Sequence, residues 1–115
     1  MTTTPADYNV TAHQGATFNL DLTYKVGGVA VDLTGFSAAM QVREKPSSQT
    51  AVLSLVDPAD ITLGGAAGTI AITATAAATA ALTPGAYRYD LELDSGSDVT
   101  RLLRGSFTIV AEVTK

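Results

Sequence analysis

The chain contains no cysteine and no tryptophan, and one of its 115 residues is a histidine. Without cysteine it can form no disulfide, no zinc–thiolate site and no thiolate nucleophile. His13, in "TAHQG", has only Asp7 as a nearby ligand, so we interpret it as an exposed polar residue near a strand edge. No G-x-S-x-G, P-loop or H-E-x-x-H motif is present. The sequence therefore predicts a non-enzymatic protein with no catalytic residue, no metal site and no cofactor.

The chain is also poor in charge of either sign. Charged residues make up 16% of it, and the net charge is -4. Its seven basic residues are scattered, whereas neutralising nucleic-acid phosphates takes clustered Lys and Arg, so we expect no nucleic-acid partner. There is no apolar run of membrane-spanning length, which predicts no membrane partner. The start, "MTTTPADYNV", lacks the basic and apolar regions of a signal peptide, so we expect synthesis in the cytoplasm.

Several segments alternate apolar and polar residues, which is typical of half-buried strands. Hydrophobic residues make up 46% of the chain, enough for one core. "VGGV" at 26–29 predicts a tight turn, and Pro46, Asp57-Pro58 and "GGAAG" at 64–68 predict further breaks. The alternation predicts that these residues face the core: Phe18, Leu20, Leu22, Tyr24, Phe36, Ala38, Met40, Val42, Ile70 and Ile72.

The stretch from Gly85 to Gly105 predicts one β-hairpin. Its turn is "SGSD", and pairing across that turn places Leu91 opposite Leu102 and Glu92 opposite Arg101. Tyr87, Tyr89, Leu91 and Leu93 then face the core, and Arg88, Asp90, Glu92 and Asp94 face outward. In this register Leu103 points outward beside Arg101. A last strand, "SFTIVAEVT", buries Phe107, Ile109, Ala111 and Val113.

These elements predict an all-β protein: an immunoglobulin-like antiparallel β-sandwich of seven to nine short strands, with a closed barrel as the alternative. The Ala-rich segment near 75–82 predicts one short helical connection, which Pro84-Gly85 ends, although an irregular loop also fits it. Residues 1–13 are expected to form a flexible N-terminal arm, and residues 14–115 a single β-sandwich domain.

Two groups of carboxylates are candidates for a catalytic or a calcium site. Asp90, Glu92 and Asp94 lie about 7 Å apart along one strand face, a spacing that an inverting glycosidase could use. Arg88 and Arg101 are their neighbours, so we interpret the group as a solvated, partly ion-paired face. "DSGSD" at 94–98 offers oxygen ligands for calcium but lacks the EF-hand spacing, and we interpret it as a hairpin turn.

Three segments of the chain resemble a group of small virion proteins of tailed phages. They are "QGATFNLDLTYKVGGVAVDLTGFSAAMQVREKP", "GTIAITATAAATAALTPGAYRYDLEL" and "VTRLLRGSFTIVAEVT". The likeness lies in "DLTG" at 32–35, "QVR" at 41–43, "YDLEL" at 89–93 and, within "RLLRG" at 101–105, the pattern R-L-L-x-G. It runs from about Gln14 to Thr114. The group is similar in pattern to the immunoglobulin-like N-terminal domain of phage baseplate upper proteins, but this chain ends at Lys115 without a receptor-binding extension.

The resemblance implies a structural protein of a tailed-bacteriophage virion, made in the host cytoplasm and present in multiple copies. It implies docking to other virion proteins, so that tail, baseplate or neck components are joined to fibres. Contact candidates are Thr3, Pro5 and Tyr8 of the arm, and Leu103. A capsid decoration (cement) protein is the alternative. A carbohydrate-binding module and a small hydrolase fit less well, because the aromatic residues face mostly inward and the acidic face has arginine neighbours.

Overall fold

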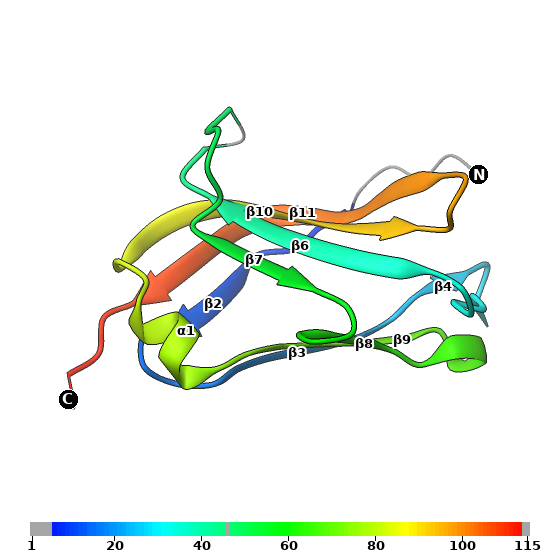
Figure 1. Cartoon of the computed structure of the whole chain (residues 1–115), viewed down its shortest axis with the longest axis horizontal. Helices are drawn as coiled ribbons and strands as arrows, with labels where there is room; N and C mark the ends of the chain where they lie inside the picture. Colours follow the sequence, from blue (N-terminus) through cyan, green and yellow to red (C-terminus); the bar gives the residue numbers. More distant parts are fainter. Residues whose placement is uncertain (1–5, 46, 114–115) are drawn as a thin grey trace.

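The computed structural model describes residues 6–45 and 47–113, which form two β-sheets packed face to face (Figure 1). The strands are β1 (Ala6–Asp7), β2 (Val10–His13), β3 (Phe18–Thr23), β4 (Lys25–Val26), β5 (Val29–Ala30), β6 (Ser37–Arg43), β7 (Leu53–Val56), β8 (Ile61–Leu63), β9 (Thr69–Ala74), β10 (Gly85–Asp94) and β11 (Val99–Val110). A 3-10 turn, η1 (Gly65–Ala67), precedes β9, and one helix, α1 (Ala76–Ala80), follows it.

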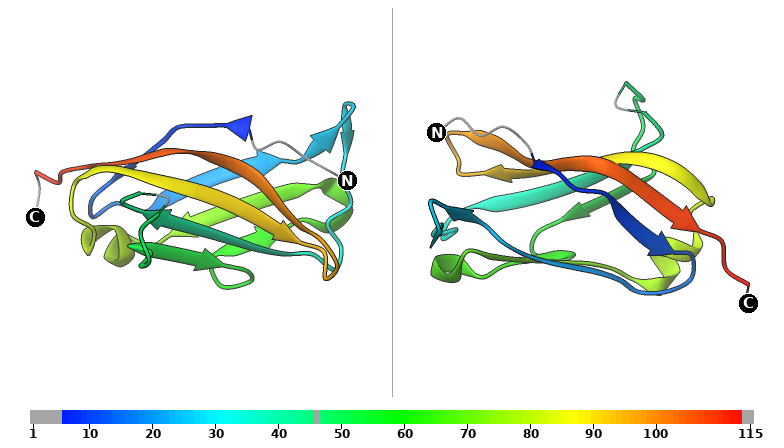
Figure 2. Two further views of the ribbon diagram at one scale, coloured as in Figure 1. Left: turned by 90° about the horizontal axis from the view of Figure 1, so that it is seen from above. Right: turned by 180° about the vertical axis from the view of Figure 1, so that it is seen from behind.

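The large sheet has the order β1-β11-β10-β6-β7, with β2 also pairing with β11. The small sheet has the order β3-β9-β8, and β4 and β5 form a separate hairpin. The chain passes from the large sheet to the small one after β2 and again after β7, and it returns to the large sheet at β6 and, through α1, at β10. The two views of Figure 2 show the long β10–β11 hairpin running along the large sheet. This hairpin presents one side to the core and the other side to solvent.

The core lies between the two sheets and follows the alternation in the sequence. Met40, Val42, Ile70, Ile72, Leu91, Leu93 and Phe107 are fully buried. The rings of Phe18 and Phe107 meet edge to face at 5.3 Å between centroids, which ties the small sheet to the large one. The predicted all-β sandwich and the short helix are therefore confirmed. Every residue that the alternation placed inward in the segments 17–43 and 69–74 is buried or packs half-buried against the core.

The structure has eleven strands in its described part, where the sequence predicted seven to nine. The extra ones include the two-residue strands β1, β4 and β5, which are too short to show an alternating pattern. The turn between β4 and β5 is as predicted: Gly27 and Gly28 have φ of 60° and 81°, which suits a tight hairpin.

The prediction of a flexible arm over residues 1–13 is wrong for residues 6–13. β1 and β2 both pair with β11, and Val10 and Ala12 are buried in the core. They run parallel to β11, so the sheet is not purely antiparallel (Figure 2). A strand added at an open sheet edge needs apolar residues only at alternate positions, and Val10 and Ala12 supply them. Residues 1–5 lie outside the described part.

The predicted hairpin register is correct on one side of a β-bulge and wrong on the other. Glu92 pairs with Arg101 as expected, but Leu91 pairs with Leu103 rather than Leu102. The register shifts between Leu91 and Glu92, so one extra residue, Leu102, enters β11 there. The shift turns Leu103 to the side of Leu91, and it lies half-buried against the core instead of pointing outward.

The last strand is shorter than the sequence predicted. β11 ends at Val110, after burying Phe107 and Ile109 as expected. Ala111 is exposed, and Val113 is 94% exposed, so the predicted burial of these two residues is wrong. Their neighbour β2 ends at His13, which leaves no strand for them to pair with in the described part of the chain. Among the described residues, no helix is long and apolar enough to span a bilayer.

Candidate docking surface

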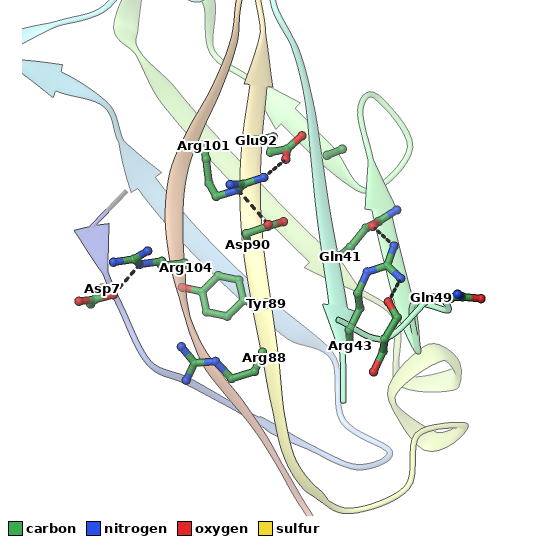
Figure 3. A pocket seen from close by; sticks show the side chains of 12 residues that line it. Asp7, Gln41, Arg43, Gln49, Arg88, Tyr89, Asp90, Glu92, Arg101 and Arg104 are labelled. Atoms are coloured by element: carbon green, nitrogen blue, oxygen red, sulfur yellow. Dashed lines mark hydrogen bonds and ion pairs between the residues drawn. The ribbon is translucent and has the colours of Figure 1, made fainter. Parts of the chain in front are cut away.

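The solvent-facing side of the large sheet carries a broad, shallow groove of about 970 Å³ (Figure 3). It crosses β6, β10 and β11 and extends to β1 and to the loop after β6. Four arginines and three carboxylates lie among its lining residues, which are Asp7, Ala39, Gln41, Arg43, Ser48, Gln49, Arg88, Tyr89, Asp90, Glu92, Arg101 and Arg104. We call this the arginine groove. Its charges differ in how far they are neutralised within the chain.

Arg101 is neutralised within the groove. Its Nε atom lies 3.0 Å from Oδ2 of Asp90, and its Nη2 atom lies 3.0 Å from Oε1 of Glu92. The hydrogen bond to Glu92, followed by the charge of Asp90, raises the pKa of Arg101. This arrangement confirms the prediction of a partly ion-paired face. Because all three side chains are more than a third exposed, their pairing contributes little to stability.

Arg104 has a partner on a strand distant in sequence. Its Nε atom donates to Oδ1 of Asp7 at 3.1 Å, joining β11 to β1. Both side chains are more than half exposed, so this ion pair is also weak. The pair lies at the side of the groove that faces β1, and it neutralises the charge of Asp7 within the chain (Figure 3).

Arg43 and Arg88 bring two positive charges to one end of the groove. They are register partners on β6 and β10, and Figure 3 shows their side chains extending to opposite sides, Arg43 toward Gln41 and Arg88 away from it. Arg43 donates from Nη1 to the carbonyl of Ser48 and from Nη2 to Oε1 of Gln41, each at 2.7 Å. Among the described residues, neither arginine has a salt bridge to a carboxylate, and Arg88 is exposed. This end of the groove therefore carries two positive charges without anionic partners.

A second hollow lies on the same sheet face, toward the turn of the β10–β11 hairpin. Its lining includes three carboxylates and no lysine or arginine. Asp57 accepts from the backbone of Ala38 at 2.6 Å, and Asp94 accepts from the backbone of Gly96 at 2.8 Å. The third carboxylate is that of Glu92. Val56 and Val99 also line it and are 48% and 63% exposed. We call this the acidic hollow.

The contact residues predicted from the sequence do not gather at these hollows. Thr3 and Pro5 lie outside the described residues. Tyr8 is 47% exposed and lies between β1 and β2, while Leu103 packs against the core. The outward positions of Arg88, Asp90 and Glu92 were predicted, but the place of Arg88 beside Arg43 in the strand register was missed. It depends on the pairing of β6 with β10, which no local pattern reveals.

His13 and the segment 94–98, the other candidate ligand positions in the sequence, show ordinary local geometry. His13 is exposed at the end of β2, as predicted. The segment 94–98 is a turn closed by bonds between Ser95 and Asp98, in agreement with the hairpin interpretation. Within residues 6–45 and 47–113 no group of three or more His, Asp or Glu side chains is placed to hold a metal ion. The chain matches no protein-family model and no curated protein sequence.

Proposed function

We propose that this protein is a non-enzymatic structural component of a tailed-bacteriophage virion. In this proposal it works as an adaptor that joins tail, baseplate or neck components to fibres by protein–protein docking. The observation that carries the proposal is the broad charged face of the large sheet, with two arginines that lack carboxylate partners among the described residues. A broad, shallow groove of this kind suits contact with another protein surface better than enclosure of a small molecule.

The motifs behind the phage resemblance have structural roles, which supports the adaptor. In "DLTG", Oδ1 of Asp32 accepts from the backbone N–H of Thr34 at 2.9 Å and from its hydroxyl at 2.6 Å. The hydroxyl bond, followed by the backbone bond, lowers the pKa of Asp32. Leu33 is 1% exposed and anchors this turn in the core, while Gly35 takes a φ of 83°. The motif thus builds the sandwich that presents the docking face.

Two of the three other motifs contribute to the docking face itself. "YDLEL" lies in β10 and "RLLRG" in β11, and their outward side chains supply Asp90, Glu92, Arg101 and Arg104. Asp90, Glu92 and Arg101 belong to the pattern that the chain shares with the phage group. Such surface residues have more reason to recognise a partner than to stabilise the fold, because exposed ion pairs are weak. Of the aromatic residues in the described part, Tyr8 is the exposed one, which gives little support to a carbohydrate-binding module.

Cryo-electron microscopy of whole particles carrying the protein tests the proposal. Density that fits the sandwich at the tail, baseplate or neck is the expected result. The large-sheet face should lie against a neighbouring protein, and particles made without the gene should lack the density. Density on the capsid lattice would replace the adaptor with a cement protein. Absence from purified particles would overturn both structural roles.

A further inference from the structure

The arginine pair and the acidic hollow lie on the same strand face but cannot meet within one molecule. Arg88 and Asp94 are six residues apart on β10, which corresponds to about 20 Å along a strand. Both side chains point away from the core, since Tyr87, Tyr89, Leu91 and Leu93 point into it. The face therefore has a positive end and a negative end that lie too far apart to neutralise each other within the same copy.

We propose that a second copy of this chain supplies the missing complement, through a two-fold symmetric contact between large-sheet faces. The inference deepens the proposed function and rests on it for the expectation of several copies per particle. In the dimer β10 of one protomer lies across β10 of its partner in the opposite direction. Arg88 of each protomer then faces the acidic hollow of the other, with Asp94 as its principal partner.

The register of the large sheet fits this symmetry. Leu91 on β10 pairs with Met40 on β6, and both are fully buried. Arg88 lies three residues before Leu91 and Asp94 lies three residues after it. A two-fold axis that crosses β10 at the level of Leu91 therefore exchanges the two ends. The same axis places Arg43 of one protomer opposite Ser37 of the other, because Ser37 is the register partner of Asp94. Both arginines therefore reach the acidic hollow of the other protomer.

The composition of the face indicates how strong the contact is. Val56 and Val99 beside the acidic hollow offer apolar area to bury, and Ala39 is half-buried near the centre. A face about five strands wide and about six residues long spans roughly 20 Å in each direction, which places it among small protein interfaces. We therefore expect a weak dimer, with a dissociation constant on the order of tens to hundreds of micromolar. Because its contacts are ionic and exposed, added salt should weaken it.

Sedimentation velocity on the whole chain, over a concentration series spanning that range, tests the inference. The wild-type protein should dimerise at low salt. Arg88→Asp and Asp94→Arg should each weaken dimerisation at least about tenfold, because each places like charges against one another across the interface. An equimolar mixture of the two variants should regain most of the affinity, because the aspartate introduced in one variant then faces the arginine introduced in the other.

Two variants control for net charge. Lys25→Asp on β4 and Asp21→Arg on β3 make the same changes of charge on exposed residues away from this face, and both should dimerise like the wild type. Circular dichroism and urea unfolding of every variant separate lost association from lost folding.

A wild-type protein that stays monomeric throughout the series would overturn the inference, and so would a mixture that dimerises no better than its components. Neither result contradicts the proposed adaptor role, which would still hold if the protein were found on the tail. A dimer that forms as expected from a protein absent from particles would keep the inference and overturn the virion role.

Discussion

The hydroxyl of Tyr89 on β10 donates a 2.6 Å hydrogen bond to the backbone carbonyl of Tyr8, which lies between β1 and β2. β11 runs between these two segments, and its residue opposite Tyr89 is Gly105. A side chain at Gly105 would collide with the carbonyl of Tyr8. The absence of a side chain there lets the Tyr8 backbone come close, and Tyr89 then fixes it. This arrangement attaches the N-terminal strands to the sheet that carries the docking face.

Replacing Tyr89 with phenylalanine should destabilise the protein by about 1–2 kcal/mol, because a half-buried carbonyl loses its partner. Urea unfolding measures this change. Tyr8→Phe is the matched control: it removes an exposed hydroxyl and leaves the Tyr8 carbonyl in place, so it should change stability by less than about 0.5 kcal/mol. Equal stability of Tyr89→Phe and the wild type would show that the bond contributes nothing.

Stability should also fall at high pH through the same residue. Burial, followed by the neighbouring Tyr8, raises the pKa of Tyr89 from 10.0 to about 12. Between these values the unfolded chain loses the phenolic proton while the folded chain keeps it, so the folded state binds more protons and stability decreases as pH rises. Its contribution is complete below pH 10 and is lost toward pH 12. Urea unfolding of the wild type and of Tyr89→Phe across this range should show a shallower decline for the variant.

Gly105→Ala should be more damaging than Tyr89→Phe. The added methyl group meets the backbone of Tyr8, which cannot swing aside as a flexible side chain would. Forced repacking of this kind costs about 1–3 kcal/mol. Hydrogen exchange should show faster exchange at the amide of Tyr8, which donates to the carbonyl of Arg104. Thr100→Ala on the same strand is the control. Unchanged protection at Tyr8 would contradict the close approach.

Thr79, the one buried polar residue in the described part of the chain, joins α1 to the turn after β2. Its hydroxyl accepts from the N–H of Gly15 at 3.1 Å and donates to the carbonyl of Ala16 at 2.8 Å. Thr79→Val keeps the shape but leaves both backbone groups unpaired, so we expect a loss of about 1–3 kcal/mol in urea unfolding. Thr79→Ser keeps the hydroxyl and should lose less. A greater loss for serine would mean that packing of the methyl group dominates.

Arg88→Glu should stabilise the isolated protomer. Arg43 is the register partner of residue 88 on β6, so a glutamate there can turn toward Arg43 and pair with it, a gain of roughly 0.2–1 kcal/mol. Thermal and urea unfolding must be measured at low protein concentration, where dimers do not contribute. Arg88→Gln, which removes one positive charge without adding an attraction, should give a smaller gain. A loss of stability in Arg88→Glu would show that Arg88 supports the fold rather than a contact.

The sequence predicted the parts of the fold that depend on local alternation. Phe18, Met40, Ile72 and Leu91 were placed inward because each lies in a strand with period two, and a one-residue slip would have exposed them all. The glycine turn at 27–28 and the short helix before Pro84 were equally local. Each of these features depends on neighbours within a few residues.

The sequence could not predict features that depend on which strands meet. The bulge at Leu102 moved Leu103 from the outer to the inner side, because one extra residue reverses every later side chain. The burial of β2 depends on the open edge of β11, which lies near the other end of the chain. The candidate surface is of the same kind: Arg88 was assigned to an outward position, but only strand pairing placed it beside Arg43.

The sequence by itself determined the all-β class and the side of each long strand that faces the core, because burial of apolar residues fixes the period and the period fixes the face. The tertiary structure alone decided the register, the parallel attachment of residues 6–13 and the separation of positive and negative ends on one face. These features follow from hydrogen bonds between strands distant along the chain, whose partners no local pattern specifies.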